Sequence, residues 1–366
     1  MDIMNNNEIQ FEECRGDRWL QEDLNWIAEN GELLDRMRGS SVLVTGATGF
    51  LGSYIVRALA CANRVRGLDL TVIALVRSRE KAESVFGGLL DRSDICLLVS
   101  DVKDLISFDG DIDYIIHCAS VTTSKLMVSK PVETITVAVD GTRNMLSLAA
   151  EKKCKSFVYV SSMEVYGSFS DASKTVTESE LGYVNPLNVR SNYPESKRLC
   201  ENMCVAYKTE YNVPAKIARL AQTFGTGVLP GENRVFAQFA KSALRKENIV
   251  LHTAGKSEGN YCYVRDTVMG LFHILINGSD GEAYNVANED AHMTIAQMAE
   301  MVCDRIAGGS IEVVFDIPDT NTFGYAPETH MKLDSGKLRA LGWRPQISLE
   351  EAYRRMMNSM ISRGIS

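Results

Sequence analysis

Tyr193 and Lys197 have the types and the spacing of an acid–base pair. On a helix, residues four apart share one face, with Cβ atoms about 5–6 Å apart. A neighbouring ammonium group favours the phenolate and lowers a tyrosine pKa from its usual value of about 10. Such a tyrosine can take the proton of a substrate hydroxyl while hydride leaves the same carbon for a nicotinamide. The pair therefore predicts oxidation of an alcohol, with Lys197 also holding the nicotinamide ribose.

A glycine-rich turn, Gly46 to Gly52, is the second chemical feature. It follows the apolar run 42–44 and precedes a segment with helical character. The first glycine lets the chain reverse, the second lets backbone approach a pyrophosphate, and the third lets the helix pack on the strand. This order predicts a dinucleotide site, with an ordinary strand-to-helix turn as the alternative.

Short apolar runs alternate with longer stretches of helical spacing from residue 41 onward. This alternation is typical of an α/β fold, here a Rossmann-type doubly wound parallel sheet. Beyond Arg219 turn-forming residues become frequent, which predicts a smaller, discontinuous α/β substrate-binding lobe. Strands are expected at 42–44, 72–76, 95–99, 114–118, 157–160, 217–220, 249–251 and 311–315, and helices at 131–152 and 191–211.

Three regions are expected along the chain. Residues 1–40 form an N-terminal helical extension, 41–222 a dinucleotide-binding Rossmann domain, and 223–366 mainly the substrate-binding lobe, with some segments returning to the Rossmann sheet. In the extension, an apolar stripe favours a helix packed on the body or on a second subunit over a substrate lid. The stripe consists of Trp19, Leu20, Leu24, Ile27 and Leu33.

The composition is that of a globular protein: 45% of the 366 residues are hydrophobic and 23% are charged. A formal net charge of −8 argues against a nucleic-acid partner. The nine cysteines are odd in number and lie mostly in apolar runs, which favours reduced core residues over a metal site. No signal peptide or membrane-spanning run is apparent. We therefore expect a cytoplasmic protein without a metal, a membrane or a nucleic-acid partner.

The glycine turn and the run Tyr193-Pro194-Glu195-Ser196-Lys197 together resemble the extended short-chain dehydrogenase/reductase superfamily. The similarity is to its NAD-dependent epimerase/dehydratase family of nucleotide-sugar epimerases, dehydratases and UDP-glucuronate decarboxylases, and it runs from about Ser41 to Arg354. It implies an NAD(P)-dependent enzyme acting on a nucleotide sugar, with UDP-sugars favoured, and a homodimer in which helices 131–152 and 191–211 form a four-helix bundle. Ile135, Val139, Met145, Met203 and Tyr207 could serve that interface or the monomer core.

The same resemblance assigns the site residues. The catalytic residues would be Ser162, Tyr193 and Lys197, with Glu164 either a base at C5 or a structural hydrogen-bonding group. Substrate would be bound by Thr122, Gln222, Arg234 and Tyr261, although a lone arginine such as Arg234 is also an ordinary surface residue. The cofactor would be bound by Gly46, Thr48, Gly49, Phe50, Leu51, Gly52, Arg77, Asp101, Val102, Cys118, Ala119, Ser120, Ser161, Tyr193 and Lys197.

The cofactor is expected to be NAD, with NADP left open. An acidic residue after the second strand would favour NAD by binding the adenosine ribose. Here Arg77 and Arg79 stand instead. They could bind a 2′-phosphate or simply be solvated at the strand end, and the usual preference of epimerases favours NAD.

The reaction after the oxidation depends on neighbouring residues. Dehydratases place an aspartate where this chain has Met163, and a thioether cannot donate a proton, so dehydration is disfavoured. The run from Glu164 to Gly167 looks like that of the UDP-glucuronate decarboxylases. Those enzymes also carry an arginine about six residues before the position of Asp266, where this chain has Gly259 and Asn260, and Arg265 is expected on the wrong face.

A 4-epimerase, which needs only the oxidising residues, is therefore the favoured expectation. The alternatives are a UDP-glucuronate decarboxylase, a 4-keto-sugar reductase or dehydratase and, from another class, a cofactor-binding regulatory protein.

Overall fold

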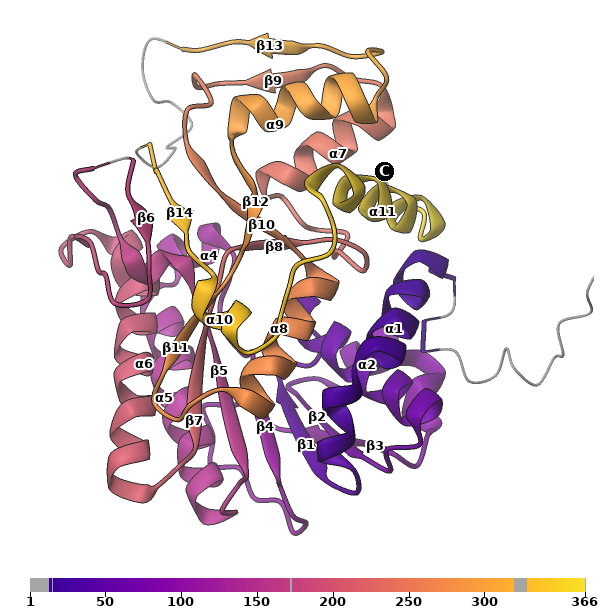
Figure 1. Ribbon diagram of the computed structural model, residues 1–366, viewed down its shortest axis with the longest axis vertical. Coiled ribbons are helices and arrows are strands. Elements are labelled where there is room, and N and C mark those ends of the chain that lie inside the picture. Colours follow the sequence, from indigo (N-terminus) through magenta and orange to yellow (C-terminus); the bar gives the residue numbers. More distant parts are fainter. Residues whose placement is uncertain (1–12, 15, 172, 319–327, 366) are drawn as a thin grey trace, which may run out of the picture.

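The computed structural model describes residues 13–14, 16–171, 173–318 and 328–365. It consists of a large parallel sheet flanked by helices and a smaller α/β lobe above one end of that sheet (Figure 1). The α/β class and the doubly wound arrangement predicted from the sequence are confirmed.

The central sheet has seven strands in the order β11-β7-β5-β4-β1-β2-β3, and every neighbouring pair is parallel. The order reverses beside β1, which leads into the glycine turn, so the turn lies at the switch point where such sheets bind ligands. The strands are β1 (Ser41–Thr45), β2 (Thr71–Val76), β3 (Ile95–Val99), β4 (Tyr114–His117), β5 (Ser156–Ser162), β7 (Ala215–Leu220) and β11 (Ala283–Val286).

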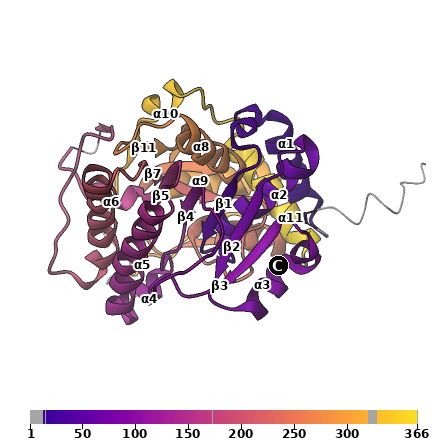
Figure 2. The same ribbon diagram turned by 90° about the horizontal axis from the view of Figure 1, so that it is seen from below.

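Helices cover both faces of the sheet, as Figure 2 shows from below. Along β1 the side chains alternate: Val42 and Val44 join the core under α2 and α8, and Leu43 joins the core under α5 and α6. Both faces are therefore buried. The flanking helices are α2 (Phe50–Arg66), α3 (Arg79–Phe86) and α8 (Val264–Asn277) on one side, and α5 (Pro131–Glu151) and α6 (Asn192–Tyr211) on the other.

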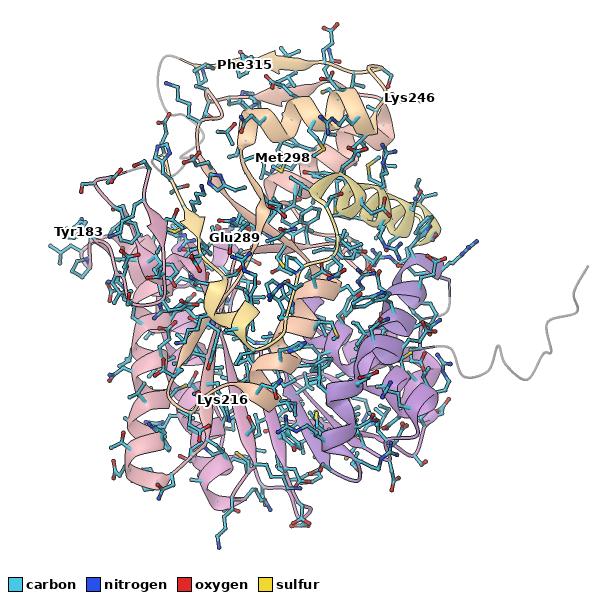
Figure 3. The ribbon with its side chains drawn as sticks, in the orientation of Figure 1. Tyr183, Lys216, Lys246, Glu289, Met298 and Phe315 are labelled. Carbon is cyan, nitrogen blue, oxygen red and sulfur yellow. The ribbon has the colours of Figure 1, made fainter. Side chains whose placement is uncertain are left out.

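The lobe has its own apolar core, in which Phe224, Phe236 and Tyr353 pack together. Figure 3 shows Met298 inside this lobe and Lys216, near the start of β7, at the opposite end of the sheet, so the carboxyl ends of the strands face the lobe. The lobe comprises β8 (Gln222–Phe224), β10 (Glu258–Tyr263) and β12 (Asn288–Thr294) in one sheet, β9 (Ile249–Leu251) paired with β13 (Val313–Phe315), and helices α7 (Val235–Arg245), α9 (Ile295–Met301) and α11 (Leu349–Ser362).

Smaller elements connect these parts. Strand β6 (Thr175–Val176) pairs with β14 (Lys332–Leu333). The short helix α4 (Ser124–Ser129) lies between β4 and α5, and α10 (Gly336–Ala340) lies between β14 and α11. Short 3-10 helices lie at η2 (Glu32–Met37), η3 (Gly87–Asp91), η4 (Met163–Tyr166) and η5 (Val189–Ser191), and η6 (Val302–Ile306) is a π-helical segment that continues α9.

The N-terminal extension contains helix α1 (Arg18–Asn30), which packs on α2, α8 and α11. Its Asp17 accepts a hydrogen bond from Ser359 and pairs with Arg363 at 3.2 Å, both in the C-terminal region. Its fully buried Asp23 pairs with Arg355 at 2.9 Å and accepts hydrogen bonds from two residues of the lobe, Tyr263 and Thr226. The extension thus lies on the body and ties the first part of the sheet domain to the lobe.

Some apolar side chains of α5 and α6 remain exposed. Met145 is completely buried in the protomer core, which is one of the two roles expected for these positions. Val139, Met203 and Tyr207 are half-buried, and Ile135 is 43% exposed. Within the described residues no helix is long and apolar enough to cross a membrane.

Candidate active site

The glycine turn is built by close backbone contacts. Gly46 has a φ of +63°, and a Cβ atom there would lie 3.0 Å from the backbone of Ala119. A Cβ on Gly52 would lie 2.3 Å from the carbonyl oxygen of Gly46. Gly49 stands at the N-cap of α2, and its amide donates to the Gly46 carbonyl at 2.9 Å. These glycines leave the N-terminus of α2 open to an anion, which fits the pyrophosphate of a dinucleotide.

The segment after β4 lies directly against this turn. Thr45 Oγ1 is 2.7 Å from Nδ1 of His117 and accepts a hydrogen bond from the amide of Ala119 at 3.1 Å. Cys118 and Ala119, both predicted to bind cofactor, therefore come together with the glycine turn, and Ser120, predicted to do the same, follows them in the chain. Burial lowers the pKa of His117 to about 3 and raises that of Cys118 to about 12, so neither is charged at neutral pH.

Lys197 projects from α6 toward the end of β5. Its side chain is buried, and Nζ donates to the carbonyl oxygen of Val160 at 2.7 Å. The same nitrogen lies 4.7 Å from the ring centre of Tyr159 and 5.7 Å from that of Tyr193. Burial lowers the pKa of Lys197 to about 8.

Tyr193 differs from the expectation in its acidity. Its pKa is raised to about 12, mainly by burial and next by the negative charge of Glu164. A hydrogen bond with Ser162 and the charges of Arg190 and Arg234 act in the opposite direction. The structure thus differs from the expected lowering of the tyrosine pKa by a nearby ammonium group, because desolvation outweighs the favourable charges.

Ser161 and Ser162 end β5 and have different surroundings. Ser162, half-buried, accepts a hydrogen bond from the amide of Glu164 and lies against Tyr193. Ser161 is buried and donates to Glu201 at 2.5 Å, and Glu201 in turn pairs with Arg219. The structure thus brings Ser162, Tyr193 and Lys197 together, and engages the Ser161 hydroxyl in a buried ion-pair network.

Glu164 forms an ion pair with Arg190 in the site. Its carboxylate is 3.0 Å from Nη2 of Arg190, whose guanidinium carbon lies 5.7 Å from the ring centre of Tyr193. Sequence reasoning missed Arg190. Its position just before the helix that carries Tyr193 is the signal that could have revealed it.

The lobe residues predicted to bind substrate fall into two groups. Arg234 is exposed, pairs with Glu232 at 2.7 Å and is close enough to Tyr193 to lower its pKa, so it faces the site. Gln222 is half-buried and stands opposite Tyr261 in the register of β8 and β10. Tyr261 is 5% exposed with its ring against Phe224, which gives it the surroundings of a core residue. Thr122 is exposed just before α4.

The residues predicted to bind adenosine lie at the ends of β2 and β3. Arg77 and Arg79 are both exposed, at the end of β2 and the start of α3. Asp101 is half-buried, accepts a hydrogen bond from the amide of Lys103 and lies 3.6 Å from its ammonium group, an arrangement also typical of a turn. Val102 is buried against α5. The remaining turn residues, Thr48, Phe50 and Leu51, are half-buried at the start of α2.

The structure shows what surrounds the positions at which the decarboxylases carry an arginine and this chain has Gly259 and Asn260. Asn260 is buried and bonds to the backbone of Asn288 and Leu333, so its amide is committed to holding the lobe strands. Arg265 points to the N-terminal extension, with its guanidinium carbon 3.9 Å from a ring centre of Trp26. The prediction that Arg265 lies on the wrong face is confirmed.

Comparisons with known proteins agree with this architecture. The family model described as NAD dependent epimerase/dehydratase family matches residues 42–287. UDP-glucuronic acid decarboxylase 6 of Arabidopsis thaliana is 30% identical over 312 residues, which cover 85% of each chain.

Solved structures show the same fold. UDP-glucose 4-epimerase of Thermotoga maritima superposes with a TM-score of 0.74 at 21% identity, over 88% of this chain and 99% of that one. UDP-glucuronic acid 4-epimerase of Bacillus cereus, solved with UDP-glucuronic acid and NAD, gives 0.71 at 20% identity, again over 88% and 99%. The match of the family model, together with the glycine turn and the fold around it, shows that this chain belongs to the NAD-dependent epimerase/dehydratase family of extended short-chain dehydrogenases/reductases.

Proposed function

We propose that the protein is a UDP-glucuronate decarboxylase, which oxidises C4 of the sugar and then releases carbon dioxide. The observation that carries the oxidation step is the cluster of Ser162, Tyr193 and Lys197 beside the glycine turn. The decarboxylase relative, similar over most of both chains, supports the choice of reaction. This choice replaces the 4-epimerase that the residues alone favoured.

Each residue of the cluster has a role in this proposal. Bound NAD supplies the hydride acceptor. Tyr193, as the phenolate, takes the proton of the C4 hydroxyl, Ser162 hydrogen-bonds the same oxygen, and Lys197 stabilises the phenolate before the transfer. When C4 is a carbonyl, it is β to the carboxylate, so the electrons of the breaking C5–C6 bond move toward the C4 oxygen as carbon dioxide leaves. The enolate that remains takes a proton at C5 from water, and Tyr193 returns its own proton to the C4 oxygen when hydride reduces C4.

A 4-epimerase is the second candidate, and the absence of an arginine at Gly259 and Asn260 favours it. Both reactions begin with the same oxidation and differ in the step after it. Dehydration is disfavoured as a third reaction, because the side chain of Met163 cannot act as an acid.

We also propose NAD as the cofactor, a UDP-sugar as the substrate, a homodimer as the assembly and the cytoplasm as the location. All nine cysteines, each in the described part of the chain, are free thiols, which supports a reducing compartment.

The test is incubation of the purified protein and NAD with UDP-glucuronate and, separately, with UDP-glucose and other nucleotide sugars. Mass spectrometry and proton NMR identify the products. We expect UDP-glucuronate to yield a sugar lighter by one carbon dioxide, and Tyr193→Phe to abolish the conversion. A product of unchanged mass with inverted coupling at C4 would instead establish the epimerase.

A further inference from the structure

We propose that Arg190 recognises the carboxylate of the substrate sugar while holding Glu164 in place. This assignment rests on the proposed use of a uronate. It would make Arg190 the residue that separates acidic sugars from neutral ones.

Arg190 lies at the entrance to α6, in the short helical turn η5. Its Nη2 is 3.0 Å from both carboxylate oxygens of Glu164, and its guanidinium carbon lies 5.7 Å from the ring centre of Tyr193. A sugar whose C4 hydroxyl reaches Tyr193 carries its carboxylate on the adjacent carbon, C5. A guanidinium that stands over the Tyr193 ring is therefore within reach of a carboxylate on the neighbouring carbon.

Most of the donors of this guanidinium remain available. Arginine has five N–H donors, arranged to meet a carboxylate in a two-pronged fashion. Within the described residues, Glu164 is the one acceptor recorded for the side chain of Arg190, and it meets Nη2 alone. The side chain of Arg190 is 32% exposed, so a ligand can reach the other nitrogens.

Charge balance gives the second argument. The Glu164 carboxylate, close enough to raise the pKa of Tyr193, would repel a substrate carboxylate entering beside the tyrosine. One cation between two carboxylates removes most of that repulsion, because a charge-assisted hydrogen bond forms on each side. Without Arg190 the site would favour a sugar with a neutral C6 group.

A purely structural role accounts less well for the pair. Glu164 is 36% exposed and Arg190 32%, and an ion pair so open to solvent contributes little to stability. In a purely structural role, the position of Arg190 above the ring of Tyr193 would have no consequence for substrate binding. The two roles can be separated by measuring ligand discrimination rather than folding.

Arg190 should act on binding more than on turnover. During decarboxylation negative charge leaves the carboxylate, so the contact is not stronger in the transition state than in the bound substrate. Interactions that bind both states alike lower KM without raising kcat. We therefore expect Arg190→Gln to raise KM for UDP-glucuronate with a smaller change in kcat.

The decisive experiment measures binding in the Tyr193→Phe background with NAD present, so that no turnover occurs. Calorimetry compares UDP-glucuronate with UDP-glucose before and after Arg190→Gln. We expect the substitution to weaken UDP-glucuronate binding about tenfold or more, the effect of losing a charged hydrogen bond, and to leave UDP-glucose within about twofold. Arg190→Lys should restore part of the difference, since a point charge replaces the fork.

Arg305→Gln is the matched control, because Arg305 is an exposed arginine of the lobe that also pairs with one glutamate, Glu350. It should change neither affinity. Equal losses for the two sugars, no loss, or no binding of UDP-glucuronate to the Tyr193→Phe protein would overturn the assignment. If the carboxylate preference depends on Arg190 and the product nevertheless keeps its mass, the decarboxylase proposal falls and the role of Arg190 stands.

Discussion

At the scale of single residues, the acidity of Tyr193 is set by a balance of opposing groups. Burial and Glu164 raise its pKa, and Ser162, Arg190 and Arg234 lower it. Lys197 has a pKa lowered to about 8 and is therefore mostly an ammonium group at neutral pH. The pair is consequently a neutral phenol beside a cation, ready to transfer a proton only when further groups stabilise the phenolate.

The first prediction concerns Glu164→Gln. Removing a negative charge beside Tyr193 stabilises the phenolate, so the pKa of Tyr193 should fall. The limb of the pH–rate profile that depends on phenolate should move to lower pH. Difference absorbance of tyrosinate, with Tyr193→Phe as the reference, measures the same shift without turnover. A shift to higher pH would contradict this balance of charges around Tyr193.

The second prediction concerns the choice of cofactor. Arg77 and Arg79 are exposed, so any contact they make with a 2′-phosphate is screened by solvent and salt. NAD should therefore bind at least as tightly as NADP, and Arg77→Ala should affect NADP more than NAD. Calorimetry with both cofactors checks this, and NADP binding tenfold tighter than NAD would refute it.

The spacing of residues in the sequence predicts part of the site, but the effects of burial on it could not be predicted. The glycine turn, Tyr193 and Lys197 could be predicted because regular elements place residues at fixed separations, whereas the role of Ser162 came from the resemblance to the family. The raised pKa of Tyr193 could not be predicted, because desolvation depends on how closely distant segments pack around the ring. The pairing of Glu164 with Arg190 depends on the path of the chain between them, which no local pattern specifies.

At the scale of elements, helix α1 holds an acidic side chain where water cannot reach it. Asp23 faces Arg355, Tyr263 and Thr226. Removing one member of a buried ion pair leaves the other without a counter-charge.

The third prediction is that Asp23→Ala lowers the free energy of unfolding by about 3 kcal/mol, the lower end of the usual range. The lower end applies because, after the substitution, Arg355 still has a counter-charge in Glu22, whose carboxylate lies 3.5 Å from its guanidinium. Urea unfolding measures the loss. Glu29→Ala, an exposed position on the same helix, is the control and should stay within about 0.5 kcal/mol of the parent. Equal effects of the two substitutions would mean that α1 is held by its apolar stripe alone.

Long periodic elements were the most predictable. The helix expected at 131–152 is observed at Pro131–Glu151, and the one expected at 191–211 at Asn192–Tyr211. The strand expected at 311–315 begins later, at Val313. The two-residue strands β6 and β14 went unpredicted, because they form only by meeting each other across a long separation in sequence.

At the scale of the whole molecule, α5 and α6 pack side by side (Figure 2). Both helices carry exposed apolar side chains. Val132 and Ile135 on α5 are 75% and 43% exposed, and Leu199 and Val205 on α6 are 49% and 39% exposed. Such a surface suits the proposed pairing with a second copy.

The fourth prediction is that the protein is a dimer at micromolar concentration and that Ile135→Glu with Leu199→Glu makes it a monomer. Two charges in the contact would be desolvated without partners. Sedimentation velocity measures the assembly. Val250→Glu, at a 46% exposed apolar position on the lobe, should leave the dimer intact. A monomeric parent protein would remove the proposal.

The general plan could be predicted from the alternation of short and long apolar segments, but the pairing within the lobe could not. Its strands β8 and β10 are near neighbours in space and far apart in sequence, and β11 leaves the lobe to join the edge of the central sheet. Contacts of this kind depend on the three-dimensional course of the chain rather than on local periodicity.

The placement of the tryptophans has a practical consequence for spectroscopy. Trp19 and Trp26 both belong to α1, each beside an arginine, and the third, Trp343, is buried against α8. Intrinsic fluorescence of this protein therefore reports chiefly on the docking of the N-terminal helix and its surroundings. A titration that leaves the emission unchanged would show that α1 stays docked, and would not show that the cofactor failed to bind.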